Sequence, residues 1–135
     1  MRALTLNRRY RAAYESDIRN VALARQGIAG FAADCGFSEE AISDIRLAAG
    51  EALSNAVEHA RGAPTRKILV HCAFGTDGLV IEIRDRGCGF PEPTDRPSIE
   101  PDHRGRGFGI FLMRRLMDEV SFSRNGTVVR LVRRR

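Results

Sequence analysis

The sequence predicts an α+β fold, a two-layer sandwich in which three helices cover one face of a mostly antiparallel, five-stranded sheet. The predicted elements follow the order strand, helix, helix, strand, strand, helix, strand, strand, without the strand–helix–strand alternation of a parallel sheet. Two pairs of strands are each joined by a short turn, as in antiparallel hairpins. The helical segments carry apolar residues at the spacing of one face, which suits helices that cover a sheet.

The N-terminal part predicts a strand over residues 2–11 and a helix over about 16–34. The strand is indicated by a two-residue alternation, and the helix by apolar residues at the spacing of one helical face. Ser16 is the expected N-cap of the helix, and Gly36 marks its end.

The second predicted helix begins at Ser38, its expected N-cap, and is stopped by the Arg-Gly-Ala-Pro stretch at 61–64. Along one flank of its apolar face, Glu51, Asn55 and His59 follow one another at i, i+4 and i+8. From these residues alone, the flank is either the polar edge of an amphipathic helix or part of a functional site.

Residues 66–74 and 79–85 predict a hairpin around the turn at 75–78. Its second strand has apolar residues at alternate positions, and Asp85 continues that buried row. A buried carboxylate is costly without a partner. Asp85 therefore either bonds to nearby backbone or awaits a donor from a ligand.

A long loop over 86–106 contains four of the five prolines, and loops of this length in compact domains are usually lids or binding loops. The helix that follows is expected to end at about 119. Its buried face consists of Ile110, Leu112, Met113, Leu116 and Met117. Strands are then expected at 120–124 and 127–133, joined by Asn-Gly at 125–126.

Length and composition indicate one domain over residues 1–135, with 43% hydrophobic and 29% charged residues. No apolar stretch approaches the roughly 18 residues of a membrane span, and the arginine-rich first thirty residues do not resemble a secretory signal. We therefore expect a cytoplasmic protein. Cys35, Cys72 and Cys88 are odd in number and lack CxxC spacing, which argues against a disulfide framework or a zinc site.

The net charge of +5 is carried almost entirely by arginine, because Lys67 is the only lysine. The chain has neither a P-loop lysine nor the strand lysine of the usual eukaryotic protein kinases. The arginines are dispersed except for the run at 130–135, so nucleic acid is not an expected partner. That run is either a solvated tail or part of a protein interface.

Gly105, Gly107 and Gly109 form a glycine-rich turn that leads into a helix N-terminus, where free N–H groups and the helix dipole favour an anion. Alone, such a run also fits a flexible turn. Without a P-loop lysine, a divalent metal would neutralise phosphate, and the side-chain oxygen of Asn55 suits Mg²⁺. Glu51, one turn earlier, could then act as a base.

Three separated motifs now agree: Glu-x-x-x-Asn at 51–55, Asp-x-Gly-x-Gly at 85–89 and Gly-x-Gly-x-Gly at 105–109. Together they resemble the N, G1 and G2 boxes of the GHKL (Bergerat-fold, histidine-kinase-like) ATPases. Within that superfamily, RLAAGEALSNAVEHA at 46–60 and GRGFGIFLMRRLMDEV at 105–120 resemble the bacterial anti-sigma-factor serine/threonine kinases. The likeness covers nearly the whole chain.

The resemblance implies a binding site for ATP or ADP with Mg²⁺. It implies that Asp85 accepts a hydrogen bond from the adenine amino group, that Asn55 ligates Mg²⁺ and that Glu51 is the catalytic base. Gly87 and Gly89 would shape the adenine pocket. His59 is then a typical residue of the helix end and not a phosphoacceptor.

In the lid, the resemblance implies that the phosphates are lined by Gly105, Arg106, Gly107, Phe108 and Gly109. Arg106 departs from the smaller or apolar residues common there, and either contacts phosphate or projects outward. Cys88 departs within the second box, and its position beside the nucleotide makes it a candidate for sensitivity to alkylation.

As a function, the resemblance implies a kinase that sequesters a sigma factor and phosphorylates a serine of an anti-sigma-factor antagonist, acting as a homodimer through its first strand and helix. Two hypotheses remain open beside it. One is a non-catalytic, nucleotide-dependent binding module, and the other is a detached ATP-binding domain that serves a separate histidine-phosphotransfer protein. Glu51 favours the kinase. Neither nucleic acid nor a membrane is an expected partner.

Overall fold

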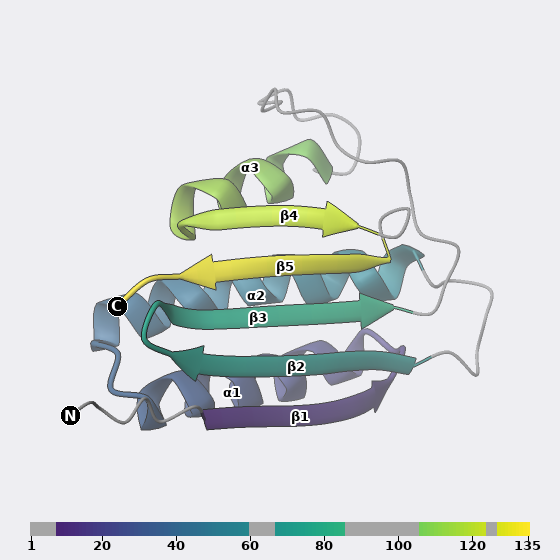
Figure 1. The fold of residues 1–135 in the computed structure, drawn as a ribbon. Helices are drawn as coiled ribbons and strands as arrows, with labels where there is room; N and C mark the ends of the chain where they lie inside the picture. Colours follow the sequence, from purple (N-terminus) through teal and green to yellow (C-terminus); the bar gives the residue numbers. More distant parts are fainter. Residues whose placement is uncertain (1–7, 60–66, 86–105, 124–126) are drawn as a thin grey trace.

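The computed structural model describes residues 8–59, 67–85, 106–123 and 127–135. Its elements are, in chain order, β1 (Arg8–Glu15), α1 (Arg19–Asp34), α2 (Glu39–His59), β2 (Lys67–Gly75), β3 (Gly78–Asp85), α3 (Arg106–Leu116), β4 (Glu119–Ser123) and β5 (Val128–Arg133). The strands form one sheet in the order β1-β2-β3-β5-β4, and the three helices lie on one face of it (Figure 1). The predicted fold class is therefore confirmed.

Every neighbouring pair of strands is antiparallel, so the sheet is antiparallel throughout. The inward rows of its three central strands pack against α1, α2 and α3 to form one core. The largest fully buried side chains of that core are Ile28, Ile45, Leu53, Val70, Leu79, Ile81, Ile83, Met113 and Leu131. No helix in the described ranges is long and apolar enough to cross a membrane.

The first strand extends further along the chain than predicted. It runs from Arg8 to Glu15, whereas the prediction was 2–11, of which residues 2–7 lie outside the described part of the chain. Tyr10 and Tyr14 alternate with exposed residues and pack against the core, and β1 pairs with β2 along its whole length. The inward tyrosines therefore carry the strand on beyond its predicted end at residue 11.

The predicted N-cap of α1 is wrong. The helix is capped at Ile18, which makes no side-chain capping bond, and not at Ser16. The first turn is instead held by Asp17, whose Oδ1 accepts the backbone N–H of Arg19 at 2.8 Å. Asp17 therefore supplies the oxygen that a serine N-cap would have supplied, although it lies one residue before the cap.

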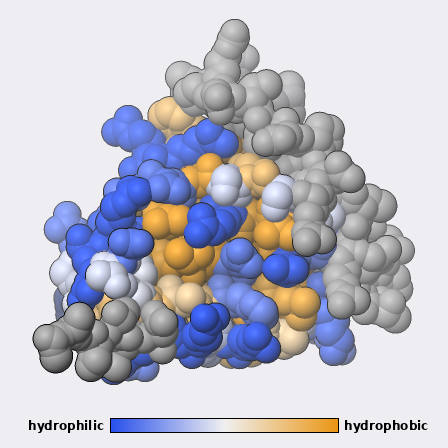
Figure 2. Space-filling view, in the orientation of Figure 1, coloured by the Kyte–Doolittle hydropathy of each residue, from blue (hydrophilic) through white to orange (hydrophobic). Residues whose placement is uncertain are grey.

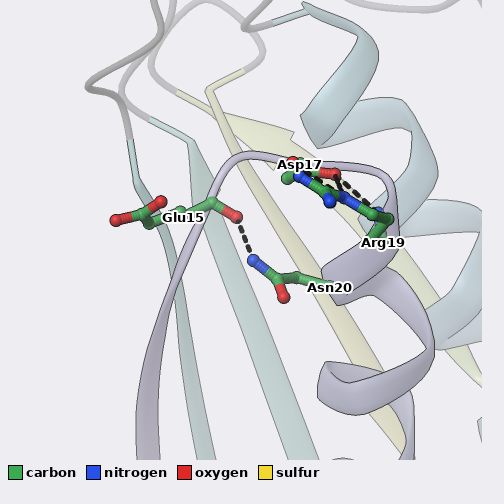
Figure 3. Close-up of polar contacts among 4 residues, drawn as sticks. All are labelled: Glu15, Asp17, Arg19 and Asn20. Carbon is green, nitrogen blue, oxygen red and sulfur yellow. Dashed lines mark hydrogen bonds and ion pairs between the residues drawn. The ribbon is translucent and has the colours of Figure 1, made fainter.

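The corner between β1 and α1 is fixed by two further contacts (Figure 3). Asn20 Nδ2 donates to the backbone oxygen of Glu15 at 2.9 Å, and the Arg19 guanidinium pairs with Asp17 at 2.7 Å. Hydrogen bonds from the side chain and backbone of Arg19 lower the pKa of Asp17 to about 2. The corner connects the edge strand to the helix layer.

The boundaries of α2 and α3 were predicted with mixed success. Ser38 caps α2 as predicted, because its Oγ accepts the backbone N–H of Ala41 at 3.1 Å. However, α3 ends at Leu116 and not near 119, since the N–H of Asp118 already donates to Val132 of β5 at 2.8 Å. The predicted turn residues at 61–64 and 125–126 lie outside the described ranges.

The three described helices all lie behind the sheet in Figure 1, and Figure 2 shows the outer face from the same side. In that view apolar side chains lie between charged ones across the strands. Along the middle of the face, Arg11, His71, Glu82 and Arg130 occupy paired positions on β1, β2, β3 and β5. The face of the sheet that the helices cover contains the core. The candidate sites lie where helices and strands begin or end, at the edges of that face.

Candidate functional site

The predicted site residues gather at one end of the sandwich. At this end β3 finishes, α2 finishes and α3 begins, while β5 starts beside β3 (Figure 1). Asp85 is the last residue of β3, Asn55 lies in the penultimate turn of α2, and Gly109 is in the first turn of α3. Asn55 and Asp85 are 30 positions apart in the sequence and Asp85 and Gly109 are 24 apart, yet all three lie at one edge.

Asp85 is buried, as its position in the strand predicted. It is 5% exposed and is the one charged residue that is buried among those the structure describes. Its backbone N–H donates to the carbonyl oxygen of Thr127 at 2.8 Å, which fixes the end of β3 against the start of β5. A buried carboxylate at the end of a strand is a strong acceptor for a ligand N–H donor.

Asp85 lies in a narrow cavity between α2, α3, β3 and β5. The cavity is lined by Ala52, Asn55, Ala56, Ile83, Asp85, Met113, Phe122, Thr127 and Val129. Most of this lining is apolar, and a flat heteroaromatic ring with an exocyclic amino group would match apolar walls and one carboxylate. Its volume of ≈ 10 Å³ admits about one water molecule, so a purine requires side chains such as Phe122 to move aside.

Glu51 is held against the first turn of α3. A Cβ added at Gly109 would lie 2.7 Å from Oε1 of Glu51, so the carboxylate at the end of that side chain would have to shift to admit it. Gly109 is therefore required for this close approach of backbone to carboxylate. Glu51 and Asn55 are both half-buried and lie one turn apart on α2, which aligns the predicted base with the predicted metal ligand.

The residues present fit Mg²⁺ by their chemistry. The amide oxygen of Asn55 is a suitable single oxygen ligand, and Mg²⁺ commonly takes its remaining ligands from phosphates and water. Asn55 lines the same cavity as Asp85, so the predicted metal ligand and the predicted base acceptor lie close together. Glu51 lies one turn nearer the N-terminus of α2.

Several predicted site residues are not described. Gly87, Gly89, Gly105 and the lid at 86–105 lie outside the described residues, as do the side chain of His59 and that of Arg106. Phe108 is described, and it is 48% exposed and stacks on Phe111 with ring centroids 6.2 Å apart. It does not line the cavity around Asp85.

Sequence reasoning missed three lining residues, namely Phe122 on β4, Thr127 just before β5 and Val129 on β5. The signal was present in the register. Once β5 pairs with β3, Ile83 lies opposite Val129, and Thr127 must then lie next to Asp85. Strand pairing between hairpins separated by a helix cannot be read from local spacing, which is why these residues were not predicted.

A second and much larger cavity, ≈ 700 Å³, lies at the opposite end of the sandwich. It contains none of Glu51, Asn55 or Asp85, so its size does not identify it with the predicted nucleotide site. The predicted site corresponds to the smaller cavity by chemistry and position, because the predicted residues Asn55 and Asp85 line that cavity.

Comparison with known proteins identifies the family to which the chain belongs. The family model described as the histidine kinase-like ATPase domain matches residues 14–133. Serine-protein kinase RsbW of Listeria monocytogenes is 36% identical over 109 residues, which are 74% of this chain and 69% of that protein. Serine-protein kinase RsbW of Oceanobacillus iheyensis is 35% identical over 112 residues, 76% of this chain and 71% of its own. The protein of that name from Bacillus licheniformis is 34% identical over 110 residues, 74% of this chain and 68% of its own.

Proposed function

Because the chain belongs to the family of histidine kinase-like ATPase domains, and to the branch that contains the serine-protein kinases RsbW, we propose that it is itself an ATP-dependent serine/threonine protein kinase. We further propose that it sequesters a sigma factor and phosphorylates a serine of an anti-sigma-factor antagonist. Phosphorylation would change which partner is bound, and so act as a partner switch in the cytoplasm.

The observation that carries this proposal is the position of Glu51. Its carboxylate lies against the backbone of Gly109, at the start of the helix that follows the glycine-rich motif, and it is one helical turn from Asn55. A module that only bound nucleotide would need Asn55 and Asp85, but it would not need a carboxylate at the phosphate end of the site. This favours the kinase over the binding module.

In the proposed reaction, the hydroxyl oxygen of the antagonist serine attacks the γ-phosphorus of ATP. A bond forms between that oxygen and phosphorus, while the bond from phosphorus to the β,γ-bridging oxygen breaks and leaves ADP. Glu51 accepts the proton of the attacking hydroxyl. Asp85 accepts a hydrogen bond from the adenine amino group and so sets the position of the nucleotide along the cavity.

Mg²⁺, when bound, would neutralise charge on the phosphates. The chain's own contribution is to hold the reactants in register: Asn55 supplies one ligand oxygen, and α2 keeps it one turn from Glu51. Asn55 and Glu51 are both on α2, so the helix fixes the spacing between the proposed metal ligand and the proposed general base.

The test is phosphoryl transfer from labelled ATP to proteins that co-purify with the chain. Glu51→Gln should bind ATP and its partners as the wild type does, yet transfer should fall by at least about 10²-fold, the effect of losing a general base. Asn55→Ala should impair Mg²⁺-dependent ATP binding and transfer together. A wild-type protein that transfers phosphate to no partner would favour the non-catalytic module.

We also propose a homodimer that forms through β1 and α1. In the described sheet β1 is an edge strand, and its outer edge can pair with a second copy. Light scattering at micromolar concentration measures this directly. A mass of one chain would contradict it.

A further inference from the structure

The ≈ 700 Å³ cavity lies at the end of the sandwich remote from Asp85. There the connection between α1 and α2, the turn between β2 and β3, the end of α3 and the C-terminal residues after β5 come together (Figure 1). It is lined by Cys35, Gly36, Phe37, Ser38, Ala41, Asp44, Phe74, Arg115, Leu116, Met117, Asp118, Arg133, Arg134 and Arg135. Its volume falls within the range of sites that bind small molecules or peptide side chains.

The lining is basic. It contains four arginines, at 115, 133, 134 and 135, against the two acids Asp44 and Asp118. Both acids already accept bonds from the chain: Asp44 pairs with Arg133 at 3.1 Å, and Asp118 accepts the backbone N–H of Arg134 at 2.6 Å. The cavity therefore keeps an excess of positive charge that its own acids do not neutralise.

Two of the arginines are available to a ligand. The guanidinium of Arg135 lies 5.0 Å from the ring centre of Phe74, and that of Arg115 lies 5.9 Å from that of Phe111. Neither guanidinium makes a hydrogen bond or ion pair with the part of the chain that the structure describes. An arginine supported by an aromatic ring still presents its N–H fork to a carboxylate.

An apolar wall lies beside these arginines. Phe37 and Phe74 meet edge to face with ring centroids 5.7 Å apart, and both are half-buried. Aromatic residues and arginine together are the composition enriched at protein–protein contacts.

We propose that this cavity binds an acidic segment of a partner protein, with carboxylates on Arg115 and Arg135 and an apolar side chain against Phe37 and Phe74. Charge complementarity selects the acidic partner. A nucleic acid is disfavoured because a concave cavity of this size admits side chains rather than a duplex backbone. The arginine run at 130–135 thereby acquires a function, in that its last three residues line the site.

This site shares no residue with the cavity around Asp85. The two cavities lie at opposite ends of α2, whose start contributes Ser38 and Asp44 to one and whose later turns contribute Asn55 to the other. The proposal therefore does not rest on phosphoryl transfer, and its test uses binding alone.

The experiment measures the fluorescence anisotropy of a labelled peptide of alternating glutamate and leucine, titrated with the full chain at physiological salt. Arg115→Glu combined with Arg135→Glu should weaken binding by about tenfold or more, since two charge-assisted contacts become repulsive. Arg46→Glu combined with Arg130→Glu changes the net charge equally at exposed positions of α2 and β5 that do not line the cavity, and should alter the affinity by no more than about twofold.

Equal losses in the two double variants would mean that the peptide responds only to net charge, and would overturn the proposal. Absence of peptide binding to the wild type would overturn it as well. Backbone amide shifts supply a second readout: the peptide should perturb Gly36 and Phe37 and leave Gly109 unchanged. A short DNA duplex that competes with the peptide and loses affinity in the same double variant would identify an anion site of another class.

Discussion

The two ends of the sandwich differ in how they are built and in what they can bind. At one end a narrow apolar cavity holds a buried carboxylate, Asp85, with Asn55 on its wall and Glu51 close by. At the other end a wide cavity is lined by arginines and aromatic rings. The first end can recognise a donor on a flat base, while the second can recognise carboxylates on a chain.

The two sites also differ in how close together their residues are in the sequence. Spacing alone places Glu51 and Asn55 side by side on one helix and Asp85 at the end of a buried row, while their predicted roles come from the family resemblance. The basic cavity is assembled from the start of α2, a hairpin turn, the end of α3 and the end of β5. No motif joins these segments, and only the fold brings them together.

The largest effect should come from Gly109→Ala, which tests the contact between the first turn of α3 and Glu51. The added Cβ would lie 2.7 Å from Oε1 of Glu51, so either the carboxylate or the helix must move. A displacement of about 1 Å at a catalytic group can cost on the order of 10²-fold, so transfer should fall by about that factor. Rates of labelled-phosphate transfer measure it.

Gly30→Ala is the matched control for that change. Gly30 is exposed on α1, and a Cβ added there meets nothing within 4 Å. Transfer should be unchanged, and stability should rise by about 0.4–1 kcal/mol because alanine restricts the unfolded chain. Equal losses of transfer in the two variants would remove the Glu51 contact as the cause.

Asp85→Asn tests recognition at the narrow cavity. An amide in place of the carboxylate offers a weaker acceptor or a competing donor to the adenine amino group, and should weaken ATP binding by about 1–3 kcal/mol. Calorimetry on the folded variant measures the change. Unchanged ATP affinity would mean that Asp85 serves only the end of β3, where its N–H bonds to Thr127.

Much of the fold and part of the nucleotide end could be predicted from sequence, for identifiable reasons. The element order, the Ser38 cap and the buried row that ends at Asp85 all depend on spacing within a single element. The end of the first strand was predicted too early because its alternation does not mark where it stops, and only the pairing with β2 carries it on to Glu15. Thr127 was missed because it reaches Asp85 through the pairing of strands from two different hairpins.

Arg133→Met tests whether the basic end also holds the helices together. Nη1 of Arg133 donates to Asp44 on α2 at 3.1 Å and to the carbonyl oxygen of Leu116, the last residue of α3, at 2.7 Å. Methionine keeps much of the apolar stem but leaves both acceptors unpaired, which should cost about 1–3 kcal/mol of stability. Urea denaturation measures it.

Arg130→Met, on the outer sheet face, is the control for Arg133→Met and should stay within about 0.5 kcal/mol of the wild type. ATP affinity should be unchanged in both variants if the two ends act separately. Weaker ATP binding in Arg133→Met alone would mean that losing the Arg133 contacts affects the proposed nucleotide site through α3. The two ends of the sandwich would then not act separately.

The smallest expected effect is a change in the rate of cysteine alkylation, which tests the two ends of the sandwich separately. Cys35 lines the basic cavity and is half-buried, and Cys88 is predicted to lie beside the nucleotide. Burial raises the pKa of the Cys35 thiol, and raises that of Cys72 from 9.0 to about 12. Because only the thiolate reacts, Cys72 should resist iodoacetamide at pH 8 and serve as the internal reference.

The rates of labelling are measured by mass spectrometry of the labelled peptides. ATP should slow labelling of Cys88 by a factor of a few and leave Cys35 unaffected, whereas the acidic peptide should slow labelling of Cys35 and leave Cys88 unaffected. Protection of Cys35 by ATP would contradict the separation of the two sites, since no nucleotide contact is proposed at that end.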